Sequence, residues 1–383
     1  EGVYNSTSDR SLYVNLNHAG SGGNLSIIGA GENTVIDLLG SSYFMDNRNS
    51  NSMILLKDLT ICNGKYNTYA AIRNYGTLTI DNLNVYNCIE TRNNYNGYVI
   101  GGGGKLNVLN SRFSQNSAGG GILYYAYYVF NSTFISNSAL SSSGGGGAIF
   151  ATSDLQVIKS TFINNTAKLN GGAISANVLD VYNSTFINNK ADNFGGAIIV
   201  SSGVMQNNKF INNSAKVAGA AIYCNGGLTT SNTTVENCVS PKDNYIYFSN
   251  LASTSSKLQY VVLDNSSMTI NSVNIKVYAS VSDEEGRPVS GSEVKFLLDG
   301  NSVASSEVIN GTASSSFKKY LNGTHKISVS LPNQLCDVKT GSITVIPLEN
   351  IDVYISPDGD DENGDGSRIS RSEERRVGKE CRS

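Results

Sequence analysis

The sequence contains no tryptophan, two histidines and five prolines in 383 residues, and only 15% of its residues are charged. His18 and His325 lie far apart, and neither neighbours a nucleophile motif. Histidine is the side chain whose charge most easily changes near neutral pH, so its scarcity weakens any case for acid–base or nucleophilic catalysis. With a net charge of −3 and no basic cluster, the chain offers no electrostatic basis for binding nucleic acid.

Long apolar runs and metal-binding patterns are also missing. No apolar run reaches the length of about 18 residues that a transmembrane helix needs. The six cysteines show no C-x-x-C spacing, which argues against zinc; a bridge between Cys62 and Cys88 on neighbouring repeats is left open. The acidic run 361–366 fits the first half of a calcium loop, but Ser372 stands where the closing glutamate belongs. We therefore favour a solvated turn and expect no metal and no cofactor.

What the sequence does contain is a repeat with a fixed period, of about 24 residues, in the range typical of stacked arrays. The stretch from Leu155 to Ile222 reads nearly the same way three times, with Phe162, Phe186 and Phe210 in equivalent places. Each copy has short strand-like segments, an Asn-Asn pair or its equivalent, and a Gly-Gly-Ala-Ile segment or a close variant. Asn and Gly tolerate the left-handed backbone of tight corners. Such a unit cannot bury a face alone, so the repeat predicts a stacked β-solenoid.

The same phase extends beyond the three clearest copies. The equivalent positions are Ile36, Ile61, Val85, Phe113, Phe134, Phe162, Phe186, Phe210 and Val235. At a strand spacing of about 4.8 Å, these nine turns predict a rod roughly 40–45 Å long.

An asparagine recurs three residues after each phenylalanine. In a stack, identical amides lie above one another and can hydrogen-bond along the axis. We therefore expect a structural ladder, with no catalytic, cofactor-binding or metal-binding role, made of Asn116, Asn137, Asn165, Asn189, Asn213, Phe113, Phe134, Phe162, Phe186 and Phe210. Cys88 and Cys238 occupy the ladder position of their turns, which predicts buried thiols.

The pairing of Phe-x-x-Asn with Gly-Gly-Ala-Ile resembles the repeat of polymorphic outer-membrane proteins of bacteria. It is still more similar to adhesin-like surface proteins of methanogenic archaea, whose first turns resemble Leu25 to Asp37. The resemblance implies a right-handed parallel β-helix of pectin-lyase type over residues 1–250. It also implies an extracellular, cell-surface location, with surface glycans or other cells as partners. Val85 and Val235 depart from the pattern, because they stand where the family has Phe.

A second pattern begins after the repeats. Alternating apolar residues from Val273 to Val281, followed by further short strand candidates, predict an antiparallel sandwich. Its Gly286-x-Pro288-Val289 turn resembles immunoglobulin-like modules of bacterial and archaeal surface proteins. The whole chain is thus predicted to be all-β. The expected division is a β-helix (1–250), a linker (251–267), an immunoglobulin-like β-sandwich (268–348) and the truncated start of a further module (349–370).

Residues 371–383 break with everything before them, since charged side chains make up more than half of this segment. They resemble the translation of a sequencing adapter, and we expect them not to be native. The alternative is a genuine basic tail that binds acidic surfaces.

Two functions are weighed. Polysaccharide lyases and glycoside hydrolases share the β-helix fold and need clustered acids. The acids of the regular turns occupy unrelated repeat positions: Asp58, Asp81, Glu90, Asp154, Asp180, Asp192 and Glu236. We therefore expect a non-catalytic surface protein, with a carbohydrate-active enzyme as the alternative.

Two surface features are noted. Four tyrosines within 122–130 suggest a row that stacks on sugars, but we favour alternate tyrosines packing inside. Asparagine sequons, compatible with a glycosylated exterior protein, occur at Asn5, Asn24, Asn131, Asn164, Asn183, Asn212, Asn232, Asn265, Asn310 and Asn322.

Overall fold

The structure is a computed structural model of the 383-residue chain. It describes residues 2–4, 23–31, 33–40, 43–94, 96–249, 260–263, 267–269, 274–282, 287–318, 323–331, 337–338 and 341–345. All regular elements among these residues are β-strands, as the sequence predicts. The stretches 349–370 and 371–383, for which the sequence gives expectations, lie outside the described residues.

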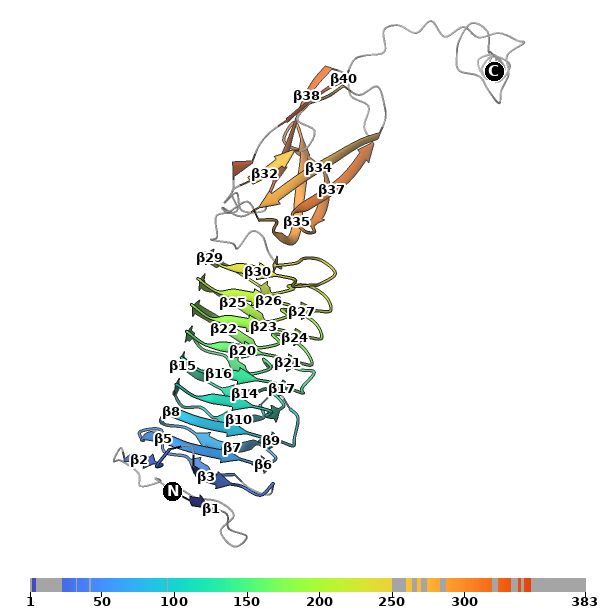
Figure 1. Ribbon diagram of the computed structural model, residues 1–383. Coiled ribbons are helices and arrows are strands. Elements are labelled where there is room, and N and C mark those ends of the chain that lie inside the picture. Colours follow the sequence, from blue (N-terminus) through green and yellow to red (C-terminus); the bar gives the residue numbers. More distant parts are fainter. Residues whose placement is uncertain are drawn as a thin grey trace, which may run out of the picture.

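The repeats stack into a solenoid whose turns contribute strands to four parallel columns (Figure 1). The first column contains β4 (Met45–Asn47), β7 (Tyr69–Asn74), β10 (Tyr98–Gly101), β14 (Gly121–Tyr124), β18 (Ile149–Ala151), the first parts of β22 (Ile174–Tyr182) and β25 (Ile198–Gln206), β28 (Ile222–Cys224) and β31 (Ile246–Phe248). The second contains β2 (Asn24–Ile28), the first parts of β5 (Met53–Cys62) and β8 (Thr77–Tyr86), β11 (Leu106–Leu109), β15 (Ala126–Phe130), β19 (Leu155–Ile158), the second parts of β22 and β25, and β29 (Leu228–Ser231).

The other two columns complete each turn. The third contains β1 (Gly2–Tyr4), β3 (Thr34–Asp37), the second parts of β5 and β8, β12 (Arg112–Ser114), β16 (Thr133–Ile135), β20 (Thr161–Ile163), β23 (Thr185–Ile187), β26 (Lys209–Ile211) and β30 (Thr234–Glu236). The fourth is a seven-stranded sheet of two-residue strands: β6 (Lys65–Tyr66), β9 (Ile89–Glu90), β13 (Ser117–Ala118), β17 (Ser138–Ala139), β21 (Thr166–Ala167), β24 (Lys190–Ala191) and β27 (Ser214–Ala215).

The strand register confirms the predicted phase. All nine marker positions pair in one unbroken series along the third column, from Ile36 opposite Ile61 to Phe210 opposite Val235. The spacing irregularities are absorbed in loops, because Phe134 still pairs with Phe162 across one of the longest intervals in the series. The solenoid of about nine turns is therefore as the sequence predicts.

Two corners of each turn depend on left-handed backbone. The first corner joins the second and third columns, and the second corner joins the third and fourth. In the turn of Phe186 they are Asn183 (φ 51°) and Asn188 (φ 53°). Asparagine enters this region more readily than bulkier residues, which explains why the repeat is so rich in it.

The C-terminal region forms two further sheets that share a buried apolar cluster including Val281, Val294 and Phe296. One sheet contains β32 (Tyr260–Leu263), β34 (Asn274–Ser282), β37 (Thr312–Lys318) and β39 (Asp337–Val338). The other contains β33 (Ser267–Thr269), β35 (Ser290–Leu298), β36 (Asn301–Val308), β38 (Gly323–Ser330) and β40 (Gly341–Val345). Most of the pairings are antiparallel, but β32 pairs in parallel with β39 and β33 pairs in parallel with β40.

The last solenoid turn is joined directly to this region. Strand β31 pairs in parallel with the start of β35, so the first-column sheet continues across the boundary. Lys242 Nζ lies 2.7 Å from Glu307 Oε1, and the Tyr247 hydroxyl also donates to Glu307. Arg287 Nη1 donates to the Thr233 carbonyl at 2.6 Å. We call this set of contacts the junction.

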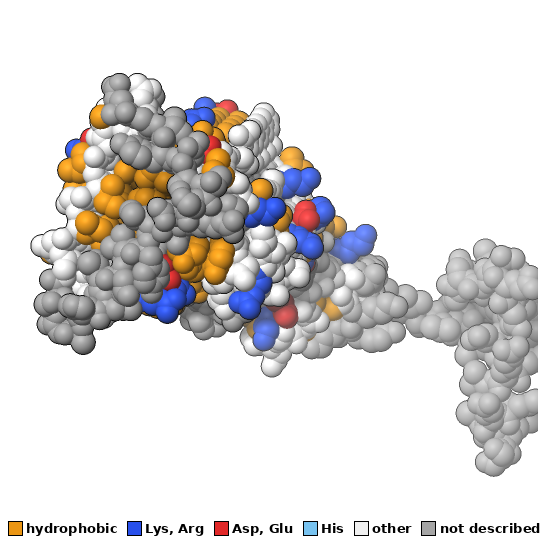
Figure 2. All heavy atoms as spheres, turned by 90° about the horizontal axis from the view of Figure 1, so that it is seen from below, with side chains coloured by type: hydrophobic (Ala, Val, Ile, Leu, Met, Phe, Trp, Pro, Cys, Tyr) orange, Lys and Arg blue, Asp and Glu red, His pale blue; other side chains and the backbone are white. Residues whose placement is uncertain are grey.

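The opposite end of the rod shows exposed apolar side chains. Seen from below, such side chains gather at this end (Figure 2). The exposed large apolar residues near this end include Ile28 and Met53, which are 61% and 56% exposed.

Candidate functional site

The centre of the solenoid is filled by a phenylalanine stack. Neighbouring rings among Phe113, Phe134, Phe162, Phe186 and Phe210 lie 4.8–5.0 Å apart between centroids and within 8° of parallel. None of the five has any exposed surface. The stack supplies packing and offers no group for chemistry.

The asparagines three residues later form a buried hydrogen-bonded row. Asn165 Nδ2 donates to Asn189 Oδ1 and to the Phe134 carbonyl, both at 3.0 Å. Asn165 Oδ1 in turn accepts from the backbone N–H and Nδ2 of Asn137, at 3.1 and 3.0 Å. Each amide is thus fully engaged with neighbouring turns, which leaves no free donor or acceptor for a substrate.

Thiols replace the amide at both ends of this row. The Cys88 N–H donates to Asn116 Oδ1, and Cys88 Sγ accepts from the Gly64 N–H at 3.4 Å. Cys238 Sγ accepts from the Asn213 N–H at 3.3 Å. Burial raises the pKa of the Cys88 thiol to about 12, so it stays protonated and unreactive. Cys62 and Cys88 are both free, so the bridge left open by the sequence is not formed.

One buried carboxylate, Asp46, sits in a cluster on the first column. Arg73 and Arg48 both bind it, and the Tyr69 hydroxyl donates to it at 3.3 Å. Burial opposes the charge, but hydrogen bonds from the two guanidinium groups outweigh it and hold the Asp46 pKa below its ordinary value. Sequence reasoning missed this cluster. The feature that identifies the cluster is the pairing of Asp46 with Arg73 in register on neighbouring turns, which becomes visible once the strands are aligned.

Two other buried carboxylates bind the backbone. Glu90 accepts from the Gly119 N–H at 3.0 Å and the Arg92 N–H at 2.6 Å. Asp243 accepts from the Gly219 N–H at 2.6 Å in the last turn. Burial raises the pKa of both carboxyl groups despite these donors. Each carboxylate therefore holds a loop in place and has no second acid beside it in these contacts.

The remaining acids of the described turns are scattered. Asp81 lies 3.3 Å from Lys57, and Glu236 lies 2.9 Å from Lys209, in partly exposed ion pairs. Across the described part of the chain, no group of three or more His, Cys, Asp or Glu side chains is placed to hold a metal ion.

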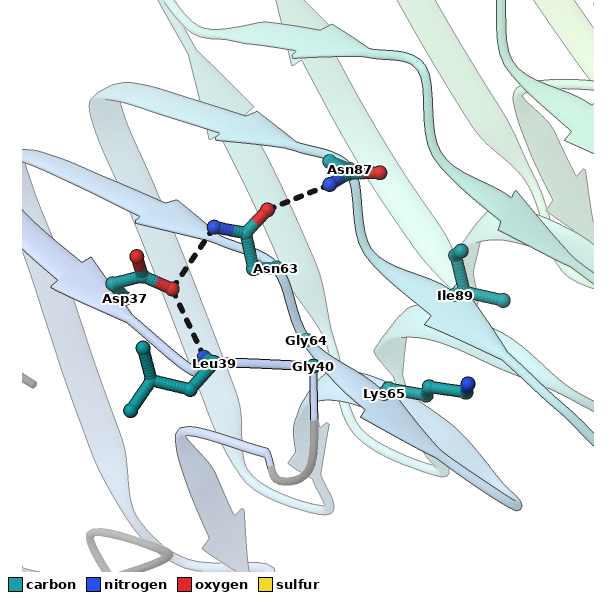
Figure 3. Close-up of a pocket in the computed structure, with 8 residues that line it drawn as sticks. All are labelled: Asp37, Leu39, Gly40, Asn63, Gly64, Lys65, Asn87 and Ile89. Atoms are coloured by element: carbon teal, nitrogen blue, oxygen red, sulfur yellow. Dashed lines mark hydrogen bonds between the residues drawn. The ribbon is translucent and has the colours of Figure 1, made fainter. Parts of the chain in front are cut away.

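A shallow pocket of about 340 Å³ opens near the N-terminal end of the rod (Figure 3). Asp37 Oδ1 accepts from the Leu39 N–H and from Asn63 Nδ2, both at 2.9 Å. Asn63 Oδ1 then accepts from Asn87 Nδ2 at 2.6 Å. Lys65 also lines the pocket, with its amine directed away from Asp37 (Figure 3). With one carboxylate in its lining, this pocket does not supply the pair that glycoside hydrolysis uses.

The tyrosines within 122–130 correct one expectation. Tyr124, Tyr125, Tyr127 and Tyr128 all lie outside the core, so the prediction that alternate tyrosines pack inside is wrong. Tyr125 has a left-handed backbone (φ 61°), and the pairing of β15 with β11 skips Tyr127. The corner and this bulge both break the alternation of strand side chains. We call these four residues the tyrosine edge; Tyr127 is 46% exposed.

Comparison with known proteins agrees with the geometry of the stack. Four segments match the Chlamydia polymorphic membrane protein (Chlamydia_PMP) repeat, at residues 131–152, 159–177, 183–200 and 209–225. The chain is a β-helix repeat protein. The matched segments cover the turns in which the phenylalanine stack and the asparagine row are most regular.

The other comparisons add little. No curated protein matches the chain. A solved structure of Clostridium thermocellum CbhA fibronectin(III)-like modules is 19% identical over 23% of this chain and 94% of that chain, with a TM-score of 0.16. A likeness at that score carries no argument about fold or function. No helix that would cross a bilayer occurs among the described residues.

Proposed function

We propose that this chain belongs to a non-catalytic cell-surface protein whose solenoid is a stiff stalk or display surface for contact with glycans or other cells. The observation that carries the proposal is the match of four turns to a repeat named for membrane proteins. The engagement of the buried polar groups in structure supports it. The scattered acids do not favour the enzyme alternative.

We place the contact surface on the tyrosine edge. Aromatic rings present an apolar face and a polar hydroxyl, a combination suited to sugar rings and to protein surfaces alike. The Lys105 amine lies 3.7 Å from the centre of the Tyr127 ring, which adds one positive charge beside the edge. Tyr124 packs against Tyr98 and Phe150, and Tyr128 stacks on Phe130. None of the four tyrosines is fully buried, so each keeps ring surface that a ligand can contact.

We also propose that the C-terminal region, expected at residues 268–348, is an immunoglobulin-like spacer that follows the β-helix of residues 1–250. Strand β32 (Tyr260–Leu263) pairs with β34, so we extend the spacer into the expected linker 251–267. The alternating strands and the antiparallel pairings support this assignment.

The test measures binding of the purified chain to intact cells and to a panel of immobilised oligosaccharides. Replacing Tyr125, Tyr127 and Tyr128 by serine should weaken binding about tenfold, since a loss of about 1.4 kcal/mol corresponds to that factor. The matched control replaces Tyr66 by serine; Tyr66 is 38% exposed and lies on β6 of the fourth column, which holds none of the four edge tyrosines. Equal binding by both variants would reject the edge, and absence of binding by the native chain would reject the contact role.

An activity assay separates the enzyme alternative. We expect no cleavage of pectin, alginate or related polyuronates, with or without calcium. Unsaturated uronide products above a heat-inactivated control would overturn the non-catalytic assignment.

A further inference from the structure

Five asparagine sequons fall on the two corners of the regular turns. Asn131, Asn183 and Asn232 occupy the first corner, and Asn164 and Asn212 occupy the second. All five have left-handed backbone, with φ between 46° and 54°, and all five are exposed. Asn-x-Ser/Thr is the acceptor pattern for N-linked glycans.

The sequons alternate between corners from turn to turn. The turns of Phe134, Phe162, Phe186, Phe210 and Val235 carry Asn131, Asn164, Asn183, Asn212 and Asn232 in that order. Each of these turns has one sequon, and successive turns use opposite corners. Along either corner the sequons are therefore two turns apart, or about 9.5 Å, rather than one strand spacing of about 4.8 Å.

The alternation has two causes. At Ser136 and Lys159 the left-handed corner residue is not an asparagine, and at other corners the residue two places later breaks the sequon. Asn188 and Asn207 are also corner asparagines with left-handed backbone. Their sequons are broken because Lys190 and Lys209 stand where Thr or Ser would complete them. In the turns of Phe186 and Phe210 the chain thus keeps the corner asparagine, which the backbone favours, and loses the sequon where both neighbours on the same corner have one.

The corner amides project from the rod. Among the described residues, the side-chain amides of Asn164, Asn183, Asn212 and Asn232 make no hydrogen bond, whereas Asn131 Nδ2 donates to Asn110 Oδ1 at 2.9 Å. An Nδ2 that carries a glycan keeps one N–H, so the Asn131 bond can persist.

The middle residue of each sequon is buried. These residues are Ser132, Asn165, Ser184, Asn213 and Thr233, which are at most 4% exposed. In the closed turn the sequon is therefore not a flexible loop that a transferase could bind. We infer that the glycan is attached before that turn closes.

We propose that these five corner asparagines are N-glycosylated, and that their alternation spaces the glycans in two rows along the rod. Asn Nδ2 attacks the anomeric carbon of a lipid-linked oligosaccharide diphosphate. The N–C bond forms, the C–O bond to phosphate breaks, the diphosphate leaves with the electron pair, and the amide proton passes to a base of the transferase. The proposal rests on the surface location, since the donor is encountered during export.

The first experiment secretes the chain, with an added export signal, from an N-glycosylating yeast. Glycopeptide mass spectrometry then measures the occupancy of each site. We expect glycans at all five asparagines, and Thr234→Ala should remove only the one at Asn232. Because export is imposed, empty corner sites in the secreted protein would overturn the glycan assignment without affecting the proposed contact function, which the cell-binding assay judges.

The second experiment tests the spacing. Lys190→Thr completes a sequon at Asn188, one turn from both Asn164 and Asn212. The matched control, Ile89→Thr, completes a sequon at Asn87 on the same corner, and the neighbouring corner residues Asn63 and Gln115 do not belong to sequons. Ile89 is 39% exposed, so its replacement leaves the core intact.

We expect occupancy of Asn188 at least twofold below that of Asn87, or a compensating loss at Asn164 or Asn212. Any chain filled at all three crowded sites should melt at a lower temperature than the same chain after enzymatic glycan removal. Full occupancy of Asn164, Asn188 and Asn212 on one chain, with unchanged melting, would overturn the spacing inference.

Discussion

Asn188 and Asn189 are adjacent asparagines with opposite environments. Substitutions at the two positions therefore compare the contribution to stability of the buried asparagine row with that of an exposed corner. Asn189 is fully buried, and Asn188 is exposed. Asn189 Nδ2 donates to Asn213 Oδ1 and to the Phe162 carbonyl, both at 3.0 Å. Asn189 Oδ1 accepts from the N–H and Nδ2 of Asn165, again at 3.0 Å.

Replacing Asn189 by alanine removes all four bonds at once. It leaves at least the Phe162 carbonyl and the Asn165 N–H buried without these partners. Each unsatisfied buried group costs about 1–3 kcal/mol, so the variant should lose roughly 3–5 kcal/mol of the free energy of unfolding. Asn188→Gly, which relieves a left-handed corner and removes no side-chain hydrogen bond, should change it by less than about 1 kcal/mol.

A third variant sharpens the comparison. Cys88 and Cys238 occupy the equivalent place in other turns and accept N–H groups through sulfur. Asn189→Cys should therefore cost less than Asn189→Ala. Urea unfolding followed by circular dichroism gives the three values, with the midpoints compared at equal slope. Ordinary surface substitutions change the free energy of unfolding by about 0.5 kcal/mol or less. If the free energies of unfolding of Asn189→Ala and Asn188→Gly differ by no more than about this amount, the row does not stabilise the solenoid as reasoned.

Two further predictions concern the period and one charged cluster. Deleting the segment from Ile163 through Phe186 removes one register unit and should give a shorter folded rod, whereas deleting 163–174 should misplace the following inward side chains and unfold the stack; equal tolerance in thermal melting would contradict the solenoid. Because hydrogen bonds from Arg73 and Arg48 lower the Asp46 pKa, their stabilisation is present above the unfolded value of about 3.9 and is lost as the pH falls through the folded pKa. Arg73→Gln should therefore show a smaller drop in urea midpoint between pH 5 and pH 2 than the native chain, and parallel curves would exclude that pair as the cause.

The sequence determines the stack because its period is a constraint on every turn. Phe162, Phe186 and Phe210 must superpose if each repeat closes once, and the register follows from that requirement. The tyrosine edge could not be predicted in the same way. Its outward direction depends on a bulge at Tyr127 and a left-handed corner at Tyr125, which change which face a side chain meets.

Contacts between turns of different sequence were also beyond prediction. Asp46 and Arg73 are visible as partners only after the loops between them have been assigned to one turn. The junction is harder still, since Lys242 and Glu307 lie 65 residues apart and belong to two different patterns. No period relates the two patterns, so the sequence gives no register for that contact.

The sheet that continues from β31 into β35 has a mechanical consequence. Rotation of the C-terminal region about the rod axis would break the backbone pairing at Tyr247 and Phe248. The connection therefore resists torsion, and a rotation applied to the C-terminal region is transmitted to the solenoid. The orientation of the tyrosine edge about the rod axis is therefore fixed relative to the C-terminal region. A chain attached through that region would present the edge in one direction and would not rotate it freely about the axis.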